Sequence, residues 1–341
     1  MKRILLSTVA LVVLISGANA DGTTVKSKAG VLKFSGKHYI GFVSKDKSEG
    51  DDTNKFETRR NYLQVKAYFK DDPKDYFRIT LDTHDSEGET NVRLKYAYLY
   101  LNNVLPFTGV EIGQAHRPWI DYEEHGGWNY RSISKVFTEA HEGAHLTNSA
   151  DRGINFKTKL DTFSSELGIF NGEGYHNEQV DDKLSLEWRL TYHALGGGQH
   201  KPKATNNYAN ISFLGQQNSS SHKHEDEDLN WFGLHAVYNQ PEFLVSAQYI
   251  KTNDAHDKYA GEGYSANGEY RLMPKWNLIG RYDYFEMDID ATEKTRTIAG
   301  VAYKYNKNVE FIANVLTEEV DTNGVKSVDD TSIMLTAEIN W

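Results

Sequence analysis

The 341-residue chain contains no cysteine and only six prolines. The absence of cysteine excludes a scaffold stabilised by disulfide bonds. Proline cannot donate a backbone hydrogen bond to a neighbouring strand, so it collects in turns. Most prolines here stand between segments of alternating polarity: Pro73, Pro106, Pro202, Pro241 and Pro274. Their spacing indicates many short strands joined by turns.

The 38 Lys and Arg residues are fewer than the 48 Asp and Glu residues, which gives a net charge of −10. The sequence has no basic arm, which argues against nucleic acid as a partner. Aromatic residues are nevertheless abundant, with 21 Tyr, 15 Phe and 6 Trp. A chain that is polar on average but rich in aromatic side chains is typical of an outer-membrane barrel, in which only every second strand residue contacts lipid.

Only one long hydrophobic run is present, from Ile4 to Ile15. Lys2 and Arg3 precede it, and Ala18-Asn19-Ala20 follows it. A positive start, a short apolar core and an Ala-x-Ala site predict a cleaved secretory signal peptide over residues 1–20. The run is too short for a membrane-spanning helix, which needs about 20 apolar residues. We therefore expect one exported domain over residues 21–341.

Polar and apolar residues alternate along most of this domain, as they do in half-buried strands. In Lys183–His193, for example, Leu184, Leu186, Trp188 and Leu190 alternate with charged or polar residues. The pattern predicts sixteen strands: 31–43, 59–69, 76–84, 91–101, 107–114, 151–160, 163–170, 183–193, 207–215, 229–238, 242–250, 263–271, 275–285, 295–305, 309–317 and 331–341. In segment 91–101 the sequence does not show which residues face lipid, because Tyr96, Tyr98 and Tyr100 could face either lipid or the lumen.

The connections between these strands alternate in length. Tight turns such as 71–74, 161–162 and 273–274 alternate with longer polar segments such as 44–54, 171–182 and 318–330, with 196–206 as a long exception among the turns. Outer-membrane barrels have short turns at one end and longer loops at the other, whereas a soluble sandwich has no reason to sort its connections. A membrane-spanning sheet must close on itself. We therefore predict an all-β, 16-stranded antiparallel transmembrane barrel around an aqueous channel.

Residues 116–149 show no strand alternation and hold many Trp, Arg, Glu and His residues. A long irregular segment within a β protein is usually functional or disordered. Its aromatic content favours an ordered loop. We expect this third outside loop to fold into the mouth of the barrel and to narrow the channel.

Several short motifs resemble the phosphate-selective porin O/P family. They include Val110-Glu111-Ile112-Gly113-Gln114 followed by Arg117-Pro118, then Val136-Phe137-Thr138-Glu139, Asp151-Arg152-Gly153-Ile154, Phe170-Asn171-Gly172-Glu173-Gly174, Trp188-Arg189-Leu190-Thr191-Tyr192 and Arg281-Tyr282-Asp283. The similarity extends from about residue 30 to the end of the chain. It implies a sixteen-stranded homotrimeric porin whose third outside loop folds inward, located in the outer membrane of a Gram-negative bacterium. We expect it to contact membrane lipid and to pass small ions and solutes such as phosphate, but the resemblance does not by itself imply selectivity for phosphate.

At the predicted lumen-facing positions, basic residues outnumber acidic ones although the whole chain is acidic. A narrow pore focuses the field of its own lining, so the local sign matters more than the net charge. We expect a mild preference for anions, set by wall residues that face cations of the loop. The wall residues are Arg60, Lys66, Arg78, Lys157 and Lys159, and the loop residues are Arg117, Arg131 and Lys135, with Glu139 beside them. Because acidic residues outnumber the fixed cations within the loop, a cation-favouring general porin stays open as the alternative.

Two histidine motifs suggest metal chemistry. His141-Glu142-Gly143-Ala144-His145 matches the zinc-protease pattern, in which a rigid helix presents two His ligands. Gly143 weakens such a helix, and no third ligand follows. The run from His222 to His224 lies among acidic residues and is another weak candidate for metal binding. We therefore expect no enzyme and no cofactor, with an outer-membrane barrel enzyme as the remote alternative.

Overall fold

The computed structural model describes residues 22–27, 30–86, 89–177, 182–199, 201–218, 228–255 and 259–341. The predicted signal peptide and the candidate metal ligands His222 and His224 lie outside these ranges, so those expectations remain untested. No helix within the described ranges is long and apolar enough to cross a membrane.

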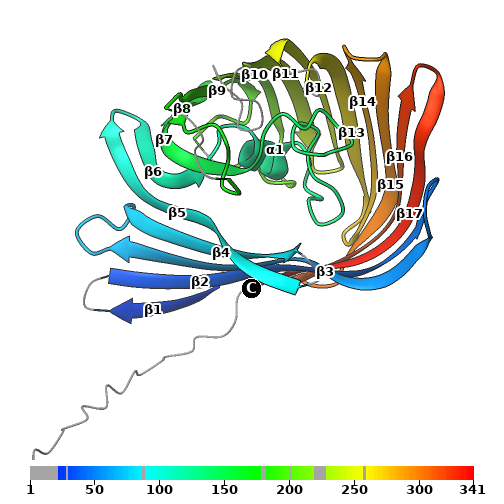
Figure 1. The fold of residues 1–341 in the computed structure, drawn as a ribbon. Coiled ribbons are helices and arrows are strands. Elements are labelled where there is room, and N and C mark those ends of the chain that lie inside the picture. Colours follow the sequence, from blue (N-terminus) through cyan, green and yellow to red (C-terminus); the bar gives the residue numbers. More distant parts are fainter. Residues whose placement is uncertain are drawn as a thin grey trace, which may run out of the picture.

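The described chain forms a closed ring of antiparallel strands (Figure 1). Each strand from β2 to β17 pairs with the next, and β17 pairs back with β2 through Thr331–Asn340 and Lys37–Asp46. The elements are β1 (Thr23–Ser27), β2 (Gly30–Asp46), β3 (Thr53–Phe69), β4 (Tyr76–Ser86), β5 (Glu89–Leu105), β6 (Thr108–His116), α1 (Ile120–Gly126), β7 (Ala150–Lys159), β8 (Phe163–Phe170), β9 (Ser185–Leu195), β10 (Tyr208–Asn218), β11 (Leu229–Gln240), β12 (Phe243–Ala255), β13 (Gly261–Met273), β14 (Trp276–Met287), β15 (Thr292–Lys304), β16 (Val309–Thr322) and β17 (Val325–Asn340). The predicted 16-stranded barrel is confirmed, with each predicted strand matched by one of β2–β17.

One strand was not predicted. β1 pairs with the first residues of β2, from Gly30 to Phe34, on the edge that β17 leaves open where the chain ends. At this junction Trp341 exchanges backbone hydrogen bonds with Gly36, and its indole Nε1 donates to His38 Nε2 at 2.9 Å. A Cβ atom at Gly36 would lie 2.5 Å from the Trp341 indole, so glycine lets the terminal aromatic residue close the ring.

The predicted alternation of faces is confirmed. Outward residues such as Ile211 and Ile333 are 55% and 57% exposed, whereas inward residues such as Asp283 and Thr191 are fully buried. The exposed apolar band on the outside of the ring suits contact with lipid. In the ambiguous strand, Tyr96 and Tyr98 face inward.

The strands are longer than predicted at the end that carries the longer connections, which we call the loop end; the opposite end is the turn end. The predicted loop 318–330 was wrong, because β16 and β17 continue to Thr322 and from Val325. Only Asn323 and Gly324 connect them, with φ of 54° and 78°. Asn-Gly with two positive φ angles is the usual two-residue hairpin turn, and its dipeptide was a signal in the sequence that the loop prediction overlooked.

Segment 116–149, which includes α1, lies inside the ring of strands (Figure 1). Its hydrogen bonds reach several sides of the ring. Arg59 of β3 donates to Ser132 O at 2.7 Å, Tyr208 of β10 to Gly126 O at 3.0 Å, and Asn277 of β14 to the Tyr130 hydroxyl at 3.1 Å.

A hydrophobic cluster lies between this segment and the inner faces of β10–β16. The segment contributes Trp119, Ile120, Trp128, Tyr130, Ile133, Val136, Phe137, Ala144 and Leu146; the strands contribute Leu214, Leu229, Trp231, Ile250, Ile279, Phe285, Ile298, Ala302 and Ile312. Burial of this many apolar side chains makes the segment part of the folded core. The interior is therefore divided into a packed side, along β10–β16, and an opposite side along β3–β9.

Candidate functional site

The opposite side of the interior holds a cavity of about 680 Å³. We call it the basic cavity. Strands β3–β10 form its wall, α1 borders it towards the loop end, and the connection 196–207 borders it at the turn end. Its charged lining comprises Lys66, Arg78, Glu111, Asp121, Lys157, Lys159, Glu166, Arg189, Lys201 and Lys203, with His116, His125 and His193.

The three acidic residues of the basic cavity are all engaged by cations or histidines. Glu111 lies 3.0 Å from Lys157 Nζ, and Glu166 lies 3.3 Å from Lys157 and 3.1 Å from Arg189. Asp121 lies 3.5 Å from His125. Lys157 and Arg189 thus compensate the charge of Glu111 and Glu166, whereas the carboxylate of Asp121 has histidines as its partners.

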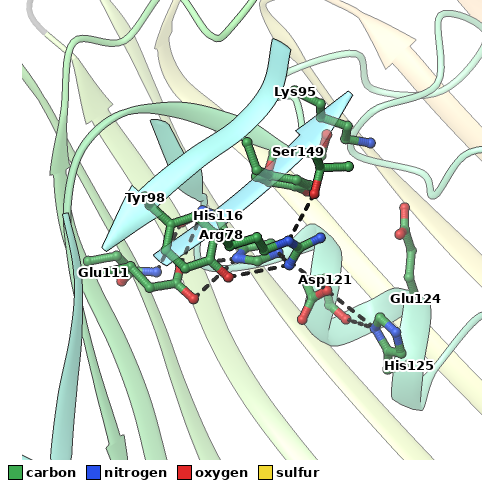
Figure 2. Close-up of polar contacts among 12 residues, drawn as sticks. Arg78, Lys95, Tyr98, Glu111, His116, Asp121, Glu124, His125 and Ser149 are labelled. Atoms are coloured by element: carbon green, nitrogen blue, oxygen red, sulfur yellow. Dashed lines mark hydrogen bonds and ion pairs between the residues drawn. The ribbon is translucent and has the colours of Figure 1, made fainter. Parts of the chain in front are cut away.

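Several cations of the basic cavity have no carboxylate within ion-pair distance in the described part of the chain: Lys66, Arg78, Lys159, Lys201 and Lys203. Lys66 Nζ lies 4.5 Å from the centroid of the Tyr76 ring. Arg78 Nη1 donates to the Tyr98 hydroxyl at 3.3 Å and contacts His116 Nε2 at 3.1 Å, and Figure 2 shows this group facing Asp121 and His125 of α1. The lining therefore carries an excess of positive charge.

The strand register explains how the sequence gathers these cations. Lys66 of β3 lies opposite Arg78 of β4. Lys157 and Lys159 are two residues apart on β7, so both point to the same face. The structure thus brings together four of the predicted wall residues in one cavity.

Two further cations were missed by sequence reasoning. Lys201 and Lys203 come from the connection 196–207, which has no strand periodicity to assign a facing direction. The connection is unusually long among those at the turn end. This length was the sequence signal that it does more than join two strands. Pro202 lies against Gly126 of α1, since a Cβ atom at Gly126 would lie 3.3 Å from the Pro202 ring.

Arg60, by contrast, does not line the basic cavity. Its Nη1 atom lies 2.6 Å from Asp82, which also lies 3.1 Å from Arg93. This group lies towards the loop end of β3–β5. Here Lys95 Nζ donates to the Tyr62 hydroxyl at 3.1 Å. The lining of β3–β5 is therefore basic from one end of the wall to the other.

The loop cation Arg117 is buried outside the cavity, 3% exposed. Its Nε and Nη2 atoms donate to the two carboxylate oxygens of Glu187 at 2.8 and 2.6 Å, and Nη2 also donates to Gln216 at 2.8 Å. This two-pronged pairing is the strongest geometry for an arginine and a carboxylate. Arg117 therefore fixes the start of the segment to β9 and β10.

The loop cation Arg131 is held within the segment. It pairs with Glu124 and with Glu139, whose Oε1 accepts from Nη2 at 3.0 Å. Burial favours a higher pKa for the Glu139 carboxyl, but Arg131 outweighs it and holds that pKa well below its usual range. Lys135 lies 3.7 Å from the same carboxylate. Arg131 and Glu139 thus form an internal clamp and do not face the basic cavity.

Glu123 of α1 is buried and accepts a hydrogen bond from Trp119 Nε1 at 2.7 Å. Burial raises the pKa of the Glu123 carboxyl to about 7, although Arg281 at 3.7 Å favours the charged form. Because this folded-state pKa exceeds the unfolded value of about 4.3, its contribution to stability is fully present below pH 4 and is lost as the pH rises through 7.

We expect Glu123→Gln to raise the free energy of unfolding at pH 8 by up to about 3 kcal/mol, because glutamine stays neutral and keeps an acceptor for Trp119. The difference between variant and parent should shrink towards pH 4.5. Denaturant unfolding of the detergent-solubilised protein at both pH values measures it. An advantage of the variant that is equal at the two pH values would contradict this interpretation of Glu123.

The zinc-protease motif does not form the helix that its chemistry requires. Residues 141–144 form turns, in which Gly143 N–H donates to Ala140 O and Ala144 N–H donates to Phe137 O. A Cβ atom at Gly143 would lie 2.5 Å from Phe137 O, so glycine serves this tight turn. Among the described residues no group of three or more His, Cys, Asp or Glu side chains is arranged to hold a metal ion.

No protein-family model matches the sequence, and no curated protein matches it closely. Solved structures are similar in fold. The anion-selective porin from Comamonas acidovorans has a TM-score of 0.67 at 12% identity, covering 91% of this chain and 99% of that one. OprB of Pseudomonas putida has a TM-score of 0.66 at 8% identity, covering 91% and 94%. The outer-membrane protein OmpT of Vibrio cholerae has a TM-score of 0.63 at 15% identity, covering 93% and 99%. The chain therefore has the fold of outer-membrane porins.

Proposed function

We propose that this protein is a porin of the outer membrane of a Gram-negative bacterium. It forms a water-filled channel for passive diffusion of small hydrophilic solutes and ions, and it favours anions. The exposed apolar band of the barrel faces membrane lipid. The observation that carries the anion preference is the basic cavity, whose acidic residues are engaged while five cations lack a carboxylate partner.

The low dielectric constant of the barrel wall strengthens the effect of these charges on a passing ion. Fixed charges in a narrow aqueous passage act on an ion much more strongly than the same charges on an open surface. Some acidic residues of the chain, such as Asp51 and Asp52, lie in an exposed connection. They are screened by salt, with a Debye length of about 8 Å at physiological ionic strength.

Segment 116–149 serves as the constriction in this proposal. Its hydrophobic cluster and the Arg117–Glu187 pair hold it against β9–β16, which leaves the basic side of the wall for solutes. The protein assembles as a homotrimer, a proposal supported by the family resemblance and by a trimer form among the solved structures of similar fold.

Two alternatives have weaker support. A cation-favouring porin would need a constriction dominated by carboxylates, but Glu124 and Glu139 pair with Arg131, and Asp121 is outnumbered by the cations of the basic cavity. An outer-membrane enzyme would need an organised acid, base and nucleophile, and residues 141–144 form turns instead of a ligand-bearing helix.

Planar lipid bilayers test the channel directly. The refolded, trimeric protein should produce stepwise conductance increases on insertion. A correctly folded trimer that inserts into the bilayer but conducts no ions would contradict the proposed function and favour the enzyme alternative.

A further inference from the structure

We propose that the basic cavity is a binding site for a small organic dianion, a molecule with two anionic groups separated by a short carbon body. This inference rests on the proposed function, since such a molecule would reach the cavity as a solute of the channel. It goes further, because a channel that merely favours anions needs only a positive lining and no site.

The cations without a carboxylate partner belong to separate parts of the cavity wall. Lys66 and Arg78 come from β3 and β4, Lys159 from β7, and Lys201 and Lys203 from the connection 196–207. Cations that surround a space suit a ligand with charge at more than one end.

Tyrosine side chains fill much of the wall between these cations: Tyr76, Tyr98, Tyr100, Tyr122 and Tyr208. The Tyr76 and Tyr100 rings stack with centroids 5.0 Å apart, and Tyr76 Oη lies 3.5 Å from Tyr98 Oη. Tyrosine gives apolar surface together with a hydrogen-bonding tip. Such a wall gains little from a fully hydrated inorganic ion but can contact the carbon body of an organic one.

The size of the cavity agrees with this ligand class. Sites for small organic molecules measure about 300–1,000 Å³ and combine apolar walls with a few polar groups that fix orientation. The basic cavity, at about 680 Å³, lies within this range.

Asp121 is the acidic residue that α1 contributes to the cavity, and Figure 2 shows it beside His125. Its carboxylate lies on the same side as Arg78 and His116, with His116 Nε2 at 3.8 Å. A carboxylate at this place repels an anionic ligand. Neutralising Asp121 should therefore strengthen binding, whereas neutralising the lysines should weaken it.

The test measures how added succinate or inorganic phosphate blocks the chloride current of the trimeric channel at pH 8, where each carries about two negative charges. Succinate should block at a concentration at least fivefold lower than phosphate. The double variant Lys159→Gln/Lys203→Gln should raise the half-blocking concentration of succinate at least tenfold, because it removes two of the cations that line the cavity, and tenfold in affinity corresponds to about 1.4 kcal/mol. Asp121→Asn should lower that concentration.

The variant Lys251→Gln/Lys326→Gln is the matched control, because both lysines are about half exposed and pair with acidic residues away from the cavity. It should leave the block unchanged. Equal block by succinate and phosphate, or equal effects of the two double variants, would overturn the inference. If either of these results is found in a channel that still favours anions, the proposed function stands and only the dianion site is contradicted. If the unmodified channel shows no anion preference, both the proposed function and the dianion site are contradicted.

Discussion

Replacing Arg117 by alanine is expected to lower the free energy of unfolding by about 3–5 kcal/mol, because it leaves the buried Glu187 carboxylate without its partner. Both residues are 3% exposed, and the guanidinium makes two hydrogen bonds to Glu187 and one to Gln216. The same change detaches the start of segment 116–149 from β9 and β10. Single-channel conductance should therefore become larger or noisier at the same time as stability falls.

Denaturant unfolding of the detergent-solubilised protein measures the first effect, and bilayer recording measures the second. Arg152→Ala is the control, because Arg152 is an exposed residue at the start of β7 and its removal should cost less than about 0.5 kcal/mol. The double variant Arg117→Met/Glu187→Leu should recover much of the lost stability, as replacement of a whole buried ion pair often does. An Arg117→Ala protein as stable as the parent would show that this pair does not anchor the segment.

Reversing charge at two cavity positions, Lys66→Glu together with Lys159→Glu, should remove most of the anion preference of the channel. The lining of the basic cavity holds seven Lys and Arg side chains and three Asp and Glu side chains, so this change of four charge units brings its net charge from +4 to zero. The lipid-facing side of the strands is unchanged. The ratio of chloride to potassium permeability in bilayers is the measurement.

The control for charge reversal is Lys251→Glu together with Lys326→Glu, which makes the same change in net charge on the exposed surface. It should leave the permeability ratio close to that of the parent. If both double variants shift the ratio equally, net charge and not the basic cavity governs selectivity.

The strands could be predicted from the sequence because lipid-facing and lumen-facing residues alternate along every strand of the barrel. In β9, for example, Leu186 faces outward and Glu187 inward, as their alternation predicted. Closure followed from the cost of an open sheet edge in lipid. β1 was missed because five residues are too few to show a period.

The packed side of the interior could not be predicted from alternation. Strand alternation around an aqueous channel predicts a polar interior, yet Ile279, Phe285 and Ile298 point inward and are buried. Their partner is segment 116–149, which is distant in sequence and has no periodicity. Only tertiary contacts show that apolar inward residues are covered by a loop.

In the candidate site, too, residues on strands could be assigned from the sequence and residues on connections could not. Lys66, Arg78, Lys157 and Lys159 could be assigned to the wall because they lie on strands. The directions of Arg117 and Arg131 could not, because a long loop fixes its side chains through particular partners such as Glu187 and Glu139. The contribution of Lys201 and Lys203 likewise depends on how one connection folds back against α1.

The central claim is that the fixed charge of the barrel interior favours anions in a chain whose net charge is −10. The reversal potential of the unmodified trimer in a gradient of potassium chloride tests it most directly. If the lining favours anions, the reversal potential has the sign of the chloride equilibrium potential and becomes smaller at high salt, where fixed charges are screened. A reversal potential with the sign of the potassium equilibrium potential would contradict it.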